Sequence, residues 1–138
     1  MIQVFSDGVE VAAGGTYPLN NATFYKGNTA IQSAAGTIAL TKRGVYMVYV
    51  DGFGTLEDEG EYSIQLAVNG FPVPQAISTT TVSAGDIGNG SFSAVVPVSG
   101  NDCPNNWTST ATLISVINPA TGAAVTDGHI NVTVTKLV

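Results

Sequence analysis

The sequence has few charged residues, and basic residues are the scarcest among them. Only 10% of the 138 residues are charged, and four Lys and Arg against ten Asp and Glu give a net charge of -6. The basic residues Lys26, Lys42, Arg43 and Lys136 form no patch along the chain beyond the pair at 42 and 43. A phosphate backbone would find little to bind on such a protein. The composition therefore predicts that nucleic acid is not a partner.

The chain also lacks a long hydrophobic run. No apolar stretch approaches the ~20 residues that a helix needs to span a bilayer. The first five residues lack the charged and hydrophobic regions of a secretory signal peptide. We therefore expect a soluble protein without a signal peptide and without a membrane partner.

Residues that commonly carry catalysis are scarce. Cys103 is the single cysteine, so the chain can form no internal disulfide and no cysteine metal cluster. His129 is the single histidine, which excludes a multi-histidine zinc site, and no Gly-x-Ser-x-Gly motif nominates a nucleophile. His129 follows Asp127-Gly128, where we expect a turn and a solvent-facing side chain. The sequence thus predicts no catalytic residue, no metal ligand and no cofactor, and we do not expect an enzyme.

The positions of the acidic residues can be explained by local structure. Most of the aspartates lie at expected turns, where their side chains accept hydrogen bonds from nearby backbone groups. The one charge run, at residues 56–61, is predicted to be a solvated loop between two strands. A calcium site there is the alternative, although the spacing of an EF-hand loop is absent.

What the sequence does contain are residues that favour strands. It is 44% hydrophobic, has sixteen glycines and is rich in Thr, Ser, Asn and Val, a composition that favours an all-β fold. The length fits one domain, residues 1–138. Between eight and ten short strands with no amphipathic helix predict an antiparallel β-sandwich. We expect a jelly roll; the alternative, an immunoglobulin-like sandwich, would normally have a cysteine pair with a tryptophan between them.

The clearest strand runs from Lys42 to Gly52, with side chains alternating between two glycines and a predicted core set of Tyr46, Val48 and Val50. Asn69-Gly70 is a strong hairpin signal. The strand after this hairpin contains two prolines, which cannot donate ladder hydrogen bonds, so it should be an edge strand or contain a bulge.

Several other segments carry weaker expectations. Residues 2–5 and 9–12 should be edge pieces on either side of a turn at Asp7-Gly8, and residues 85–90 should form a flexible glycine-rich loop. The segment 107–117 is apolar on both faces, which is typical of a strand buried on both sides. The remaining strands are expected at residues 23–25, 37–40, 62–68, 76–82, 92–98 and 130–134.

The segment from Gly44 to Val50, followed by residues 64–70, resembles the Gly-x-Tyr strand and hairpin of C1q/TNF-like jelly rolls. The whole layout, from residues 1–4 to residues 132–138, is similar to small acidic C1q/TNF-like proteins of tailed phages and prophages. The Phe-x-Phe that often follows Gly-x-Tyr in C1q domains is here Met47 and Val48, and no collagen-like stalk precedes the domain. These departures argue against receptor signalling and complement-like activity.

The resemblance implies a homotrimer that acts as a virion structural protein. The expected role is that of a capsid (head) decoration protein on the capsid surface, which binds the major capsid protein and stabilises the shell. The candidate trimer contacts are Met47, Tyr49, Phe92 and Trp107. The candidate capsid contacts, chosen because terminal segments can be free to reach a neighbour, are Met1, Ile2, Gln3, Val4 and Phe5.

An alternative function uses the same fold. A domain at the tip of a phage fibre or adhesin would bind host cell-surface glycans. It should place Trp107, tyrosines and carboxylates together in exposed loops.

Overall fold

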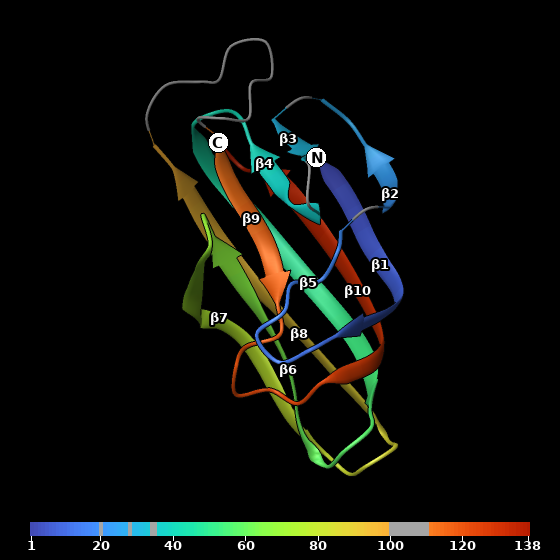
Figure 1. Cartoon of the computed structure of the whole chain (residues 1–138). Helices are drawn as coiled ribbons and strands as arrows, with labels where there is room; N and C mark the ends of the chain where they lie inside the picture. Colours follow the sequence, from blue (N-terminus) through green and yellow to red (C-terminus); the bar gives the residue numbers. More distant parts are fainter. Residues whose placement is uncertain (20, 28, 34–35, 100–110) are drawn as a thin grey trace.

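The computed structural model describes residues 1–19, 21–27, 29–33, 36–99 and 111–138. These residues form two five-stranded antiparallel sheets that face each other, with no helix among them (Figure 1). The first sheet has the order β2-β1-β10-β5-β8 and the second β3-β4-β9-β6-β7. The predicted all-β jelly-roll sandwich is confirmed. The strands are β1 (Ile2–Val11), β2 (Asn21–Tyr25), β3 (Ala30–Gln32), β4 (Ile38–Leu40), β5 (Gly44–Leu56), β6 (Gly60–Val68), β7 (Phe71–Val82), β8 (Ile87–Val98), β9 (Thr112–Ile117) and β10 (Val125–Lys136).

Strand β5 holds the first sheet together. It pairs with β10 on one side and with β8 on the other along almost its whole length. Its side chains alternate as predicted: Tyr46, Val48 and Val50 are buried in the core, while Tyr49 projects to the outside. This alternation confirms the predicted core set.

The hairpin at Asn69-Gly70 also forms as predicted. Asn69 has a φ of 52° and Gly70 a φ of 83°, the positive values that a tight two-residue hairpin turn requires. The turn joins β6 to β7, and β7 lies at the edge of the second sheet. Pro72 and Pro74 therefore occupy an edge strand, as expected from their missing N–H groups.

The N-terminal segment differs from the prediction. Residues 2–11 form one strand, β1, which lies between β2 and β10 rather than at an edge. Asp7 and Gly8 do not turn the chain; they lie in a register shift between Ser6 and Val9, where β1 bulges against β10. Gly8 has a φ of 63°, so glycine allows the bulge without ending the strand.

The prediction of a glycine-rich loop at residues 85–90 is wrong for its last four residues, because β8 already begins at Ile87. Gly88 and Gly90 lie opposite Gly54 and Gly52 of β5, where the two sheets come close together. A Cβ atom at Gly88 would lie 2.5 Å from the Cβ of Tyr62, and one at Gly90 would lie 2.4 Å from the Oγ of Ser78. These glycines are needed for close packing and not for flexibility.

Strand β9 is less buried than predicted. Ile114 and Val116 are in the core, but Leu113 and Ile117 on the opposite face are only partly covered. The expectation of burial on both faces is therefore wrong for the described part of segment 107–117.

Candidate functional site on the outer face of the first sheet

The outer face of the first sheet carries a group of aromatic side chains. They come from four strands: Phe5 of β1, Phe24 of β2, Tyr49 and Phe53 of β5, and His129 of β10. We call these five residues the aromatic face. Phe24 is 45% exposed, Tyr49 46% and Phe53 47%.

The strand registers place these side chains in neighbouring rows. Gln3 pairs with Phe24 on one side and with Thr133 on the other, and Thr133 pairs with Tyr49. In the next rows Phe5 pairs with Asn131, and His129 pairs with Phe53. Paired residues point to the same side of a sheet, so the rings share one face, on which Gln3, Thr133 and Asn131 lie between them.

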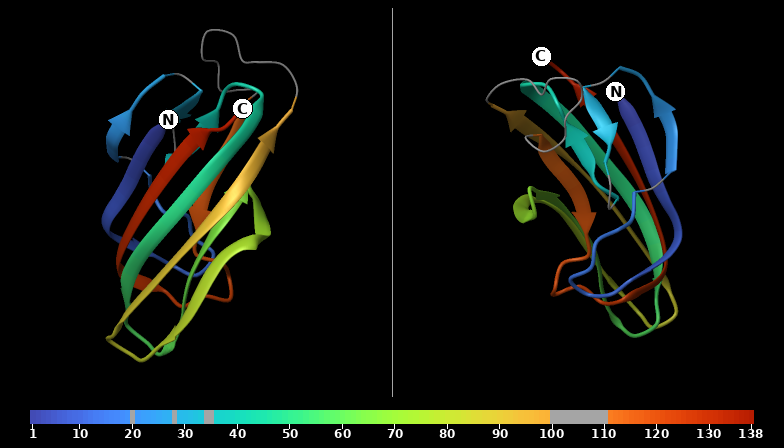
Figure 2. Two further views of the ribbon diagram at one scale, coloured as in Figure 1. Left: turned by 180° about the vertical axis from the view of Figure 1, so that it is seen from behind. Right: turned by 45° about the horizontal axis from the view of Figure 1, so that its top comes forward.

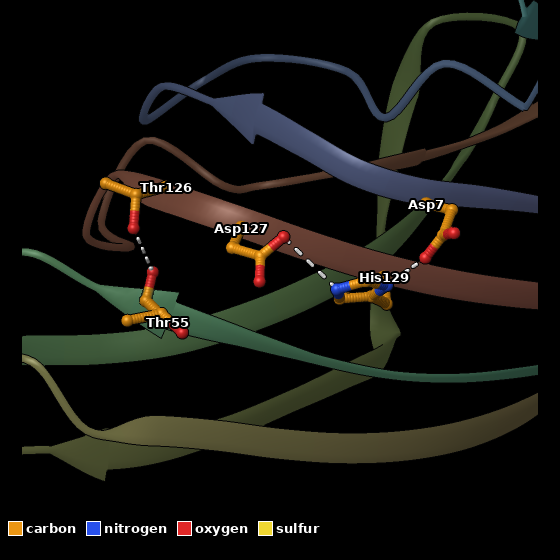
Figure 3. A network of polar contacts seen from close by, with 5 residues as sticks. All are labelled: Asp7, Thr55, Thr126, Asp127 and His129. Atoms are coloured by element: carbon orange, nitrogen blue, oxygen red, sulfur yellow. Dashed lines mark hydrogen bonds and ion pairs between the residues drawn. The ribbon is translucent and has the colours of Figure 1, made fainter.

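His129 lies at the centre of a polar network on this face (Figure 3). Its Nδ1 meets Oδ1 of Asp7, and its Nε2 lies 3.2 Å from Oδ1 of Asp127. Ionised carboxylates only accept hydrogen bonds, so a ring nitrogen that carries a proton donates to the carboxylate that it faces. Next to this network the hydroxyl of Thr126 donates to the carbonyl of Thr55 at 3.1 Å and ties β10 to β5.

The structure corrects the expectation that His129 faces solvent beside a turn. Asp127 and Gly128 belong to β10, and the side chain of His129 is only 25% exposed. The bulge in β1 directs Asp7 toward it, because Ser6 pairs with Ile130 and Val9 with Gly128, which leaves Asp7 and Gly8 opposite the histidine. The spacing of two residues between Asp127 and His129 indicates in the sequence that both side chains lie on one strand face. The contact with Asp7 could not be predicted, because it depends on how β1 pairs with β10.

Two shallow depressions flank Asp51 and Phe53 on this face. One, of about 260 Å³, is bordered by Phe5, Asp7 and His129. The other, of about 500 Å³, is bordered by Tyr49, Ile87, Asn89 and Ser91. The Oδ1 atom of Asp51 is buried between them without a hydrogen-bond partner among the described residues. A buried carboxylate oxygen without a donor is unfavourable, so this position suits a donor supplied from outside the chain.

The network does not have the groups that hydrolysis would need. Ser6 borders the smaller depression, but its hydroxyl donates to the carbonyl of Pro18. Within the described residues no three His, Cys, Asp or Glu side chains are grouped in a way that could hold a metal ion.

The residues predicted for the trimer contact lie in different places. Tyr49 belongs to the aromatic face, and Met47 lies partly buried on the same side of β5. Phe92 pairs with Val50 and packs against the core. Trp107 lies outside the described residues. Sequence reasoning did not place Phe5, Phe24 and Phe53 on one face with Tyr49, although Phe53 follows Tyr49 by four residues, the spacing of one strand face.

The predicted capsid contact, residues 1–5, is not a free segment. Ile2 and Val4 are fully buried, and β1 is paired on both sides. The reason given for the capsid contact is therefore wrong. Met1, Gln3 and Phe5 are the members of this set with exposed or partly exposed side chains, and for them the contact stays a prediction.

In the described part of the chain, the structure contains no helix with the length and apolar character needed to cross a membrane.

No protein-family model matches the sequence, and no curated protein matches it either. Solved structures do match. The globular domain of zebrafish complement 1qA has a TM-score of 0.71 at 13% identity, covering 99% of this chain and 96% of that chain. Eiger TNF from S. frugiperda has a TM-score of 0.67 at 13% identity, with 99% and 92% covered. PRD1 vertex protein P5 has a TM-score of 0.65 at 20% identity, with 99% and 96% covered.

At these identities the matches show the fold and nothing finer. The chain has the fold of C1q/TNF-like jelly-roll domains, and PRD1 vertex protein P5 is a phage protein with this fold.

Proposed function

We propose that the chain is a non-enzymatic structural protein of a phage virion, which forms a homotrimer and decorates the capsid surface. The single observation that carries the proposal is the aromatic face, which a monomer would leave in water. The match to a phage vertex protein supports the virion setting. The resemblance to C1q/TNF-like domains supports three as the number of copies.

The aromatic face is suited to an interface between copies. Phe24, Tyr49 and Phe53 are each nearly half exposed, and burying the rest of such a ring contributes on the order of 1 to 2 kcal/mol. On the outer side of β6 in the second sheet, Ser63, Gln65 and Ala67 are themselves buried, so β6 exposes no ring there. A closed symmetric assembly would cover the rings of every copy, as subunit interfaces enriched in aromatic residues do.

The polar groups on the aromatic face fit the same role. His129 lies between Asp7 and Asp127 and holds both carboxylates at this face. The unpartnered Oδ1 of Asp51 could accept a hydrogen bond from a neighbouring copy. Charge and hydrogen-bond matching of this kind gives an interface its specificity.

The test of the trimer is the native mass by light scattering over a series of dilutions. We expect three times the chain mass for the wild-type protein and a monomer for Tyr49→Arg combined with Phe53→Arg. Phe71→Arg is the matched control, because Phe71 is 76% exposed but lies at the β6–β7 hairpin of the other sheet. A wild-type monomer, or loss of the trimer in the control alone, would contradict the proposal.

The decoration role needs a separate test. Empty capsid shells of the virus that encodes the chain, prepared without it, should bind the purified protein in a co-sedimentation assay. The bound protein should raise the temperature at which the shells break. Shells that neither bind the protein nor gain stability would contradict the decoration role, although the protein could still be a trimer.

A second function, glycan binding at the tip of a fibre, is favoured by one observation. Tyr49, Asp51 and Asn89 border the larger depression, and together they offer an aromatic ring, a carboxylate with a free acceptor and an amide. The two functions compete for this face, because a trimer built on Tyr49 would cover it. Binding on an array of bacterial surface glycans that is lost in Asp51→Ala would favour the second function.

A further inference from the structure

The fold gathers all four basic side chains at one end of the sandwich. Lys26 directly follows β2, Lys42 and Arg43 directly precede β5, and Lys136 ends β10. These strand ends lie side by side because Ile2 pairs with both Tyr25 and Val134, and Lys136 pairs with Tyr46. Figure 2 shows both chain termini at this same end. The expectation that the basic residues form no patch beyond residues 42 and 43 is therefore wrong.

The spacing between these cations is short. Neighbouring strands lie about 4.8 Å apart, so Lys26 and Lys136, on strands that flank β1, are on the order of 10 Å apart. The Nζ atom of Lys136 lies against Gly44, where an added Cβ would come within 2.9 Å of it. Lys26 and Arg43 are exposed. At this spacing the repulsion between the cations is largely screened at physiological ionic strength, where the screening length is about 8 Å, so the four cations can share one end of the protein.

Seven of the nine acidic side chains in the described residues lie toward the opposite end, while Asp7 and Asp51 lie between the two ends. The β5–β6 turn carries Glu57, Asp58 and Glu59, Glu61 follows it in β6, and Asp86 lies in the neighbouring β7–β8 turn. Glu10 and Asp127 lie near the same end of their strands. Strand β5 separates Arg43 from Glu57 by on the order of 45 Å, which is several screening lengths. Among the described side chains, a protein with a net charge of -6 thus gathers its basic groups at one end and most of its acidic groups at the other.

Exposed apolar side chains accompany the cations. Met1 is 44% exposed, Tyr25 49% and Leu137 53%, and all three lie beside the basic residues. Arg, Met and aromatic residues are the types enriched where proteins bind proteins. Four cations with adjoining apolar groups match an acidic protein surface better than the dense charge of a nucleic acid.

We propose that this basic end is a docking surface for an acidic protein surface. We define the basic end as Met1, Tyr25, Lys26, Lys42, Arg43, Lys136 and Leu137. The orientation that follows rests on the proposed function: the basic end is the end of the protein that faces the capsid shell. A threefold rotation about an axis along the sandwich keeps the basic ends of all three copies on one side, and such a trimer would dock with three linked contacts.

The first test measures how tightly the basic end binds an acidic polymer in the absence of the capsid. Immobilised polyglutamate is the probe, and the double variant Lys26→Gln/Arg43→Gln is compared with Ser83→Glu/Ala84→Glu. Both variants have a net charge of -8, which is the wild-type -6 lowered by 2, but Ser83 and Ala84 are exposed in the β7–β8 turn at the acidic end. We expect salt-sensitive binding of the wild type, a loss of about tenfold or more in the first variant, and less than about twofold change in the second.

Several results of this test would overturn the proposal. They are the absence of wild-type binding, equal weakening in both variants, and tighter binding to duplex DNA or to phosphatidylglycerol vesicles than to polyglutamate.

The second test repeats the comparison on empty capsid shells. Shells that bind wild type and the Ser83→Glu/Ala84→Glu variant about tenfold more tightly than Lys26→Gln/Arg43→Gln support the orientation. Equal binding of all three overturns the orientation and leaves the decoration function standing. Shells that bind none of the three proteins overturn the decoration function. In that case the polyglutamate test still decides whether the basic end binds an acidic surface.

Discussion

The imidazole of His129 lies nearly flat against the ring of Phe53, with 4.4 Å between the ring centroids and 15° between the planes. The two residues are register partners in β10 and β5. Stacked rings gain a favourable interaction beyond the area that they bury. The contact therefore links the charge network of Asp7 and Asp127 to the aromatic face proposed as the trimer contact.

The first prediction is that His129→Gln weakens the trimer more than it weakens the fold. Without the imidazole, Asp7 and Asp127 lose the side chain that holds them and Phe53 loses its stacked ring, so we expect the trimer to dissociate at about tenfold higher concentration. The stability of the monomer should change by less than about 1 kcal/mol, because both carboxylates are largely exposed. Sedimentation equilibrium and urea unfolding measure the two effects. Asp58→Asn, in the acidic turn, is the control, and an unchanged trimer with an unstable fold would contradict the prediction.

The second prediction concerns two buried tyrosines that differ in their hydrogen bonds. The hydroxyl of Tyr46 donates to the carbonyl of Lys42 at 2.6 Å, whereas that of Tyr62 has no hydrogen-bond partner of good geometry in the described structure. Tyr46→Phe should lower the free energy of unfolding at neutral pH by about 1 to 2 kcal/mol, and Tyr62→Phe should leave it unchanged or raise it slightly. Chemical denaturation of the two variants beside wild type checks this, and an equal loss in both would contradict it.

The third prediction is a loss of stability at alkaline pH. Burial raises the pKa of Tyr17 from 10.0 to about 12, and burial also raises the pKa of Tyr62. In the unfolded chain both hydroxyls would ionise near pH 10, while in the folded protein they stay protonated. The stability from these groups is thus fully present below pH ~10 and is lost as the pH rises toward the folded-state values.

For Tyr17 alone, this loss amounts to about 2 to 3 kcal/mol between pH 10 and pH 12. Urea unfolding across this range measures it. Tyr17→Phe should flatten the decline, and a variant that declines as steeply as wild type would refute the assignment to Tyr17.

The sequence predicted those features that depend on neighbouring residues. The alternation of Tyr46, Val48 and Val50 defines one face of a strand, and Asn69-Gly70 defines a turn, so both were readable from short windows. The bulge at Asp7-Gly8 was missed because glycine after aspartate is equally compatible with a turn, and pairing with β10 decides between the two.

The site was less predictable than the fold. Tyr49 was found from its place opposite the core set, but the network around His129 requires Asp7 from a strand more than 100 residues earlier in the chain. The basic end likewise depends on which strand ends become neighbours, and that is a property of the topology. No local pattern in the sequence contains this information.

The last prediction tests the closest approach of the two sheets. Gly88 of β8 lies over Tyr62 of β6, and a methyl group at position 88 would come within 2.5 Å of the Cβ of Tyr62 and within 2.8 Å of the Cγ2 of Val82. None of these atoms can move freely, because both neighbours are buried in the core. Gly88→Ala should therefore destabilise the protein by about 1 to 3 kcal/mol through overpacking. The outward-facing Ser91→Ala in the same strand should change the stability by less than about 0.5 kcal/mol. Thermal and urea unfolding of both variants measure the difference, and a Gly88→Ala protein as stable as wild type would show that the sheets can separate at this end.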